Sequence, residues 1–152
     1  MPFPSIFDAE VTDKLIQRVE QLQPDTKPQW GKMNSAQMMA HVNATYDVSY
    51  GVTGKRLNGF MRFMLKLFVK PMVIGEKPYK KNSRTAPYFV IADERDFQEE
   101  KGRLIAYLKK SHSDGVQFFE GKDNPSFGKL TAQEWSNQFY KHLDYHLDQF
   151  GQ

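Results

Sequence analysis

The 152-residue chain contains no cysteine. Disulfide bonds, thiolate zinc sites, iron–sulfur clusters and cysteine nucleophiles are therefore excluded, and any metal must be bound by histidine, aspartate or glutamate. The first residues lack the charged start and the apolar stretch of a signal peptide, and no uncharged apolar run is long enough for a transmembrane helix. We therefore expect a cytoplasmic protein without a membrane span.

Strand-like alternation, internal repeats and low-complexity tracts are also missing from the sequence. Hydrophobic residues make up 39% of the chain and charged residues 26%, as is usual for globular proteins. The length is that of one domain with a core of its own. We therefore expect a single all-α domain covering residues 1–152.

Four segments have the apolar periodicity and the end signals of helices. The first covers residues 8–23 and stops before Pro24, the second follows Asn34 and runs to Gly51, the third follows Asp93 and fades by Gly115, and the fourth follows Thr131 and runs to Gly151. Gln37 and Glu134 stand three residues after their caps, as in a capping box.

The connection between the second and third of these helices is long. It contains Leu57–Val69, an apolar segment in which Arg62, Lys66 and Lys70 recur every four residues before Pro71 ends it. We expect an amphipathic helix that packs on the protein or across a homodimer. The long connection favours a four-helix bundle in up-down-down-up order, because it allows the second and third helices to run parallel.

Positive charge is concentrated between Lys55 and Arg84. This segment holds nine basic residues and one acidic residue, whereas the rest of the chain has 12 basic and 17 acidic residues. A solvated face is the commonest explanation of such a segment, and anionic lipid, nucleic acid or an anionic substrate are the alternatives. Because no nucleic-acid-binding motif is present, we expect no nucleic-acid partner. In an enzyme, Lys80, Lys81 or Arg84 would bind the carboxylate of a small-molecule substrate or thiol.

Three histidines lie on apolar helix faces. His142 and His146 are four residues apart and share a face, and His41 lies on the apolar side of the second helix. Buried imidazole nitrogens need partners, and three of them converging would hold a divalent ion with positions left open for water or substrate. The alternative is that they are core histidines bonded to backbone carbonyls.

Other residues near these histidines are poorer candidates. His112 lies at a polar helix end, and Asp144 and Asp148 point away from the face of the pair. Leu143 stands where a zinc protease motif has glutamate, which argues against a metalloprotease.

Two stretches of sequence carry a family resemblance. They are the residues Trp30–Met33 with Gln37–His41, and the ending from Phe127 through the histidine pair to Gly151. Together they resemble the DinB-like superfamily, and more narrowly a branch of it catalogued as a domain of unknown function. The resemblance covers nearly the whole chain. It implies a homodimer and a divalent ion bound by His41, His142 and His146.

Characterised members of that superfamily include metal-dependent transferases of low-molecular-weight thiols. The resemblance therefore implies an enzyme that uses Zn, Ni or Fe either to transfer such a thiol to a small electrophile or to hydrolyse a small substrate. No catalytic residue is assigned: Tyr46, Asp47 and Tyr50 are candidate general bases by position, and Gln37 is a candidate for orienting a ligand. The rival is a non-enzymatic helical domain that acts through a dimer or partner interface.

Overall fold

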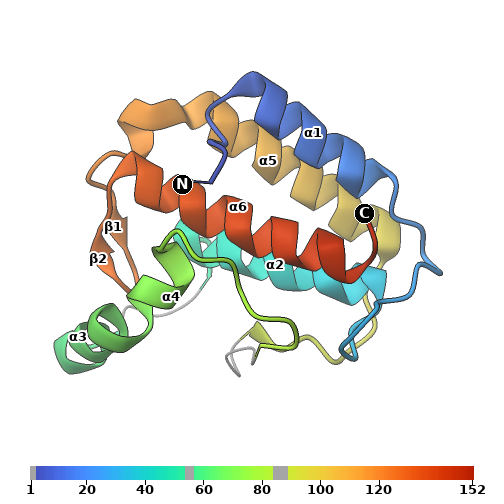
Figure 1. Cartoon of the computed structure of the whole chain (residues 1–152), viewed down its shortest axis with the longest axis horizontal. Helices are drawn as coiled ribbons and strands as arrows, with labels where there is room; N and C mark the ends of the chain where they lie inside the picture. The colour runs from blue at the N-terminus through green and yellow to red at the C-terminus, as the bar shows by residue number, and fades with distance from the viewer. Residues whose placement is uncertain (1–2, 54–56, 84–88) are drawn as a thin grey trace.

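The computed structural model describes residues 3–53, 57–83 and 89–152, and six helices make up most of that part of the chain (Figure 1). The helices are α1 (Ala9–Glu20), α2 (Ser35–Ser49), α3 (Gly59–Phe68), α4 (Lys70–Ile74), α5 (Phe97–Phe119) and α6 (Ala132–Gln149). A short hairpin of β1 (Asp123–Asn124) and β2 (Gly128–Lys129) joins α5 to α6. The fold is therefore mostly helical, as expected.

The four long helices lie side by side. α5 packs against α1, α2 and α6, and α2 also contacts α6. Followed along the chain in Figure 1, α1 and α6 run in one direction and α2 and α5 in the other. The connection between α2 and α5 carries α3 and α4, which project from one end of this group.

Side-chain caps fix where the long helices begin. Asn34 and Thr131 form the two expected capping boxes, with Gln37 and Glu134 as their partners. The expected cap at Asp93 is wrong, because α5 begins three residues later. There the carboxylate of Asp96 accepts a hydrogen bond from the backbone N–H of Glu99 at 2.8 Å.

The regular part of α5 ends at Gly115, as expected, and a further helical turn continues to Phe119. Gly115 interrupts it with a left-handed φ of 77°, which glycine adopts without steric cost. Phe119 is 1% exposed and contacts the rings of Trp135 and Phe139 on α6. Burial of this ring therefore holds the last turn against the core beyond the glycine.

One short hairpin accompanies the helices in the described part of the chain. Asp123 pairs with Lys129 and Asn124 with Gly128 in the antiparallel hairpin. The buried Asn124 side chain closes the turn, because its oxygen accepts the backbone N–H groups of Ser126 and Phe127. A two-residue strand is too short to leave an alternating pattern in a sequence.

The core lies between the long helices and is rich in stacked rings. Tyr46 of α2 stacks on Phe139 of α6, with ring centroids 4.4 Å apart, and on Tyr107 of α5 at 4.9 Å. Aromatic pairs of this kind add to the burial of their apolar area. The stack ties α2, α5 and α6 together at mid-height. Other buried members of the core are Leu15, Val19, Leu22, Met38, Met39, Leu104, Leu108, Trp135, Leu143 and Leu147.

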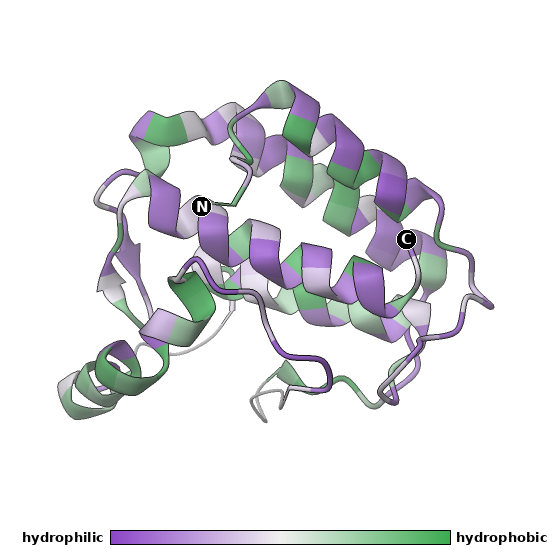
Figure 2. Ribbon diagram, in the orientation of Figure 1, coloured by the Kyte–Doolittle hydropathy of each residue, from purple (hydrophilic) through white to green (hydrophobic). Residues whose placement is uncertain are grey.

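The amphipathic segment folds as α3, which ends before Pro71 as expected. A second short helix, α4, follows, with Pro71 in its first turn, where a missing N–H has no cost. Leu65, Val69 and Val73 pack against the core, but the opposite side of α3 is exposed. Figure 2 shows this apolar helix standing away from the long helices. The expected packing on the protein therefore applies to the inner side of α3 alone. Within the described ranges, no helix is long and apolar enough to cross a membrane.

A leucine-to-alanine substitution should lower the free energy of unfolding much more in the core than on the exposed side of α3. Leu104 is fully buried and Leu67 is 54% exposed. We expect Leu104→Ala to lower the free energy of unfolding by about 2–5 kcal/mol and Leu67→Ala by about 0.5 kcal/mol or less. Urea denaturation of both variants measures the difference, and equal losses would contradict the described packing of α3.

Candidate metal centre

The three histidines expected from the sequence come together between α2 and α6. One ring nitrogen from each of His41, His142 and His146 lies within 4.8 Å of the other two. His142 and His146 are one turn apart on α6, and His41 faces them from α2 with its Nε2 atom 2.8 Å from Nε2 of His142. The two helices thus supply one compact cluster of nitrogen donors.

Hydrogen bonds to two of the rings determine which nitrogen is free. His41 Nδ1 lies 2.7 Å from the carbonyl oxygen of Phe89, and His146 Nδ1 lies 2.7 Å from Oε1 of Gln149. The amide of Gln149 is oriented by its own Nε2, which donates to the carbonyl oxygen of Trp30. Because both partners are acceptors, each Nδ1 carries the proton and each Nε2 presents a lone pair to the cluster.

Burial keeps the imidazoles neutral. It lowers the pKa of His146 from 6.5 to about 3, and it also lowers the pKa of His41. For His142, burial and the two neighbouring histidines lower the pKa well below 6.5. Metal ligands must be deprotonated, and at neutral pH none of the three rings is an imidazolium that would first have to lose its extra proton.

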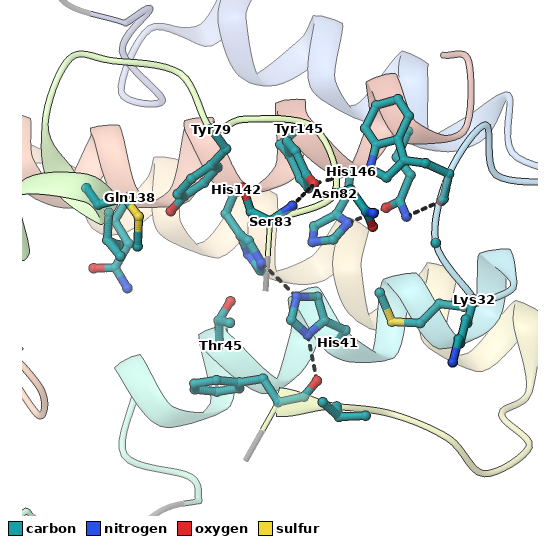
Figure 3. A pocket seen from close by; sticks show the side chains of 18 of the residues that line it. Lys32, His41, Thr45, Tyr79, Asn82, Ser83, Gln138, His142, Tyr145 and His146 are labelled. Atoms are coloured by element: carbon teal, nitrogen blue, oxygen red, sulfur yellow. Dashed lines mark hydrogen bonds between the residues drawn. The ribbon is translucent and has the colours of Figure 1, made fainter. Parts of the chain in front are cut away.

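A cavity of about 400 Å³ opens beside the cluster (Figure 3). Its lining includes the three histidines and the rings of Trp30, Tyr79 and Tyr145, with Lys32, Asn82 and Ser83 among the polar contributors. A volume of this size accommodates a small organic molecule. The open side of the histidine cluster therefore faces a space that a ligand can enter.

Tyr145 joins three segments around this cavity. Its hydroxyl oxygen accepts hydrogen bonds from Nε1 of Trp30 at 3.1 Å and from the backbone N–H of Ser83 at 3.2 Å. Its ring also meets that of Tyr79 edge to face, with centroids 5.6 Å apart. The loop before α2 and the segment after α4 are thus both tied to α6 by one side chain.

The donor set suits a transition metal. Neutral imidazole nitrogens bind Zn, Ni and Fe, and three protein ligands leave positions open for other molecules. His41 and His146 each have an oxygen acceptor at the far ring nitrogen, as metal-binding histidines usually do. The cluster can therefore hold a metal ion.

The residues judged poorer candidates from the sequence lie elsewhere. His112 lies in the last turn of α5 before its break at Gly115, where its Nδ1 is 3.1 Å from the carbonyl oxygen of Ile6. Asp144 and Asp148 form ion pairs with Arg18 at 2.7 and 3.0 Å, which attach α1 to α6. None of these three groups joins the described histidine cluster.

The basic residues expected to bind substrate are placed differently from the expectation. Arg84 lies outside the described residues. Lys80 is exposed, and the ammonium of Lys81 lies 5.4 Å from the centre of the Trp30 ring. The lysine that lines the cavity is Lys32, which follows Trp30 and Gly31 in a motif that the sequence analysis noted without giving it a role.

The candidate general bases are engaged away from the cavity lining. Asp47 accepts hydrogen bonds from Arg103 and Tyr107, and Tyr50 donates to Asp114 at 2.8 Å. Tyr46 is buried in the aromatic stack. These three side chains therefore serve the packing of α2 on α5.

Gln37 was expected to orient a ligand, but both ends of its amide act at the start of α2. Its Oε1 accepts from the backbone N–H of Asn34, and its Nε2 donates to the carbonyl oxygen of Asp93. The glutamine whose side chain contacts one of the three histidines is Gln149, at Nδ1 of His146. Its spacing of three residues from His146 on one helix was a usable signal that the sequence analysis missed. The carbonyl of Phe89 had no such signal, since any residue type supplies one.

Residues 6–152 match the profile of a family described as Protein of unknown function (DUF1569). The chain belongs to this family. The matched range includes all three histidines, Gln149 and Lys32 of this DUF1569 member. Searches of curated proteins and of solved structures found no match.

The lowered histidine pKa values predict a pH dependence for the metal-free chain. A buried His146 contributes stability that is fully present above pH 6.5 and is lost as the pH falls toward about 3, because the unfolded state binds the proton first. Between pH 7 and pH 5 we expect the wild type to lose about 2 kcal/mol more than His146→Gln. Urea denaturation with chelator present measures this, and equal losses in the two proteins would contradict it.

Proposed function

We propose that this protein is a divalent-metal-dependent enzyme of the DinB-like superfamily. His41, His142 and His146 hold the ion, and the adjoining cavity holds a small-molecule substrate. The observation that carries the proposal is the set of three neutral imidazoles grouped within 4.8 Å at a cavity of about 400 Å³. Core histidines bonded to backbone carbonyls, the alternative from the sequence, account for Nδ1 of His41 but not for the grouping of all three rings.

The surroundings of the cluster support a catalytic ion more than a structural one. When bound, a divalent ion supplies a Lewis acid that lowers the pKa of a water or thiol nucleophile. Structural sites are closed by four protein ligands, whereas three ligands beside a cavity leave room for a reactant. Transfer of a low-molecular-weight thiol to a small electrophile, or hydrolysis of a small substrate, fits such a site. The ion is Zn, Ni or Fe.

The charge and shape of the cavity indicate its substrate. Lys32 supplies a cation to the lining, and the ammonium of Lys81 lies over the Trp30 ring, 5.4 Å from its centre. A ligand with a carboxylate and an apolar portion matches this combination of ammonium groups and aromatic rings. Lys80 and Arg84 belong to the same basic segment and remain candidates for binding the carboxylate.

The superfamily assignment extends to the architecture. We infer that residues 1–152 form one domain whose long helices make an up-down-down-up bundle. The directions of α1, α2, α5 and α6 in Figure 1 support this, as does the position of the cluster on the second and last of them. The homodimer and the cytoplasmic location expected from the sequence stay predictions. The non-enzymatic rival draws its support from the exposed side of α3.

Metal content distinguishes the proposed ligands from the remaining histidine. Protein purified without a histidine tag should carry about one divalent ion per chain, and His41→Ala, His142→Ala and His146→Ala should each lose most of it. His112→Ala is the matched control, because His112 bonds to Ile6 on the far side of α5. Inductively coupled plasma mass spectrometry measures the occupancy. Loss of metal from the control together with its retention in His41→Ala would contradict the ligand assignment.

Two glutamines test which residue orients the cluster. Gln149→Leu removes the acceptor at Nδ1 of His146 and should weaken metal binding by about 10- to 100-fold. Gln37→Leu should leave the affinity unchanged and lower the stability by about 1 kcal/mol, because it opens the capping box of α2. Competition with a metal-binding dye measures the affinity, and the reverse ranking of the two variants would overturn the role of Gln149.

A further inference from the structure

The outward side of α3 is apolar. Phe60, Phe63 and Leu67 follow one another at helical spacing and are 74%, 60% and 54% exposed, and Phe68 beside them is 66% exposed. In Figure 2 most of this helix has the green of hydrophobic residues. Exposed apolar patches of this kind mark surfaces that bind something.

The helix is held in this orientation by contacts on its inner side. The guanidinium of Arg62 donates to Asp123 at 2.7 Å and to the carbonyl oxygen of Asn124, and Lys70 pairs with Glu134. Leu65 and Val69 pack against the core on that side. These bonds fix α3 to the hairpin and to α6, so the phenylalanines cannot turn inward without breaking them.

The C-terminal end of α4 is fixed as well. The ammonium of Lys141, a buried residue of α6, donates to the carbonyl oxygens of Met72 and Gly75, and the Asn137 amide donates to that of Ile74. The projection made by α3 and α4 is thus anchored at both ends. Its apolar outer side is a built surface of the fold.

Positive charge accompanies this surface. Lys66 is exposed beside the apolar stripe, and Lys77, Lys80 and Lys81 are exposed on the segment after α4. This segment and α3 both lie toward the lower side of the molecule in Figure 1. Together they belong to the part of the sequence with nine basic residues and one acidic residue.

We propose that α3 is an interfacial helix that docks the protein on an anionic lipid bilayer. Its phenylalanines enter the boundary between headgroups and acyl chains, and the lysines face the anionic headgroups. A symmetric dimer through the same side would bring two basic segments together, and their charges would repel. An anionic bilayer accommodates both the apolar stripe and the cations. This function is independent of the metal centre.

Vesicle co-sedimentation of the full chain tests the proposal. The wild type should bind vesicles of phosphatidylcholine mixed with phosphatidylserine and bind vesicles of phosphatidylcholine alone much more weakly. The double substitution Phe60→Ser with Phe63→Ser should weaken binding at least about ten-fold, and Lys66→Gln about five-fold. The matched control is Val116→Ser with Phe118→Ser, which removes two exposed apolar residues of α5 and should bind as the wild type does.

Several outcomes would overturn the proposal. Wild-type protein that ignores both kinds of vesicle, or that binds neutral vesicles equally well, excludes an anionic membrane as the partner. Equal weakening by the α3 and α5 double substitutions removes the role of α3. Light scattering measures whether the chain is a monomer or a dimer. If the wild type is a dimer that binds no vesicles, and the α3 double substitution dissociates it, this side of α3 binds a second copy of the chain and not a membrane.

Discussion

Three imidazoles within 4.8 Å of one another, two of them buried and His142 partly buried, impose the strictest condition on this structure. Unpaired buried nitrogens are costly, so α2 and α6 must face each other in one register that lets the rings share a partner. The stacked rings of Tyr46 and Phe139 lie close along the chain to His41 and His142, and they hold the two helices in that register. The Nδ1 partners at Phe89 and Gln149 then leave the lone pairs pointing inward. Core packing and donor geometry are therefore two results of one helix pairing.

Local signals in the sequence were enough to locate the long helices but not all of their ends. The capping boxes at Asn34 and Thr131 depend on residues three positions apart, and both were predicted correctly. The regular part of α5 ends at Gly115 as expected, and the further turn to Phe119 depends on contacts with rings of α6, which are distant in sequence. The start of α5 was misplaced, because Asp96 and not Asp93 caps it.

The sequence likewise predicted some residues of the candidate site and not others. Spacing on one helix predicted the pair His142 and His146, and the apolar face of α2 added His41. Three further groups of the site were not assigned from the sequence. Lys32 and the carbonyl of Phe89 reach it through loops whose course the sequence does not specify. Gln149 lies on the same helix as His146, and its spacing was overlooked. The position of α3 was likewise not predictable, since an apolar helix ordinarily turns its apolar side inward. Arg62 and Lys70 hold it the other way, through ion pairs with Asp123 and Glu134.

The central claim is that three neutral imidazoles offer their Nε2 atoms to one divalent ion. Nitrogen-15 NMR of the histidine rings during titration of the metal-free protein with Zn²⁺ tests it most directly, because protonated, free and metal-bound ring nitrogens are distinguished by their shifts. The account predicts that Nδ1 of His41 and of His146 stays protonated throughout, while Nε2 of His41, His142 and His146 changes to the metal-bound shift together. Unchanged Nε2 signals at saturating Zn²⁺, or a shift confined to His112, would contradict it.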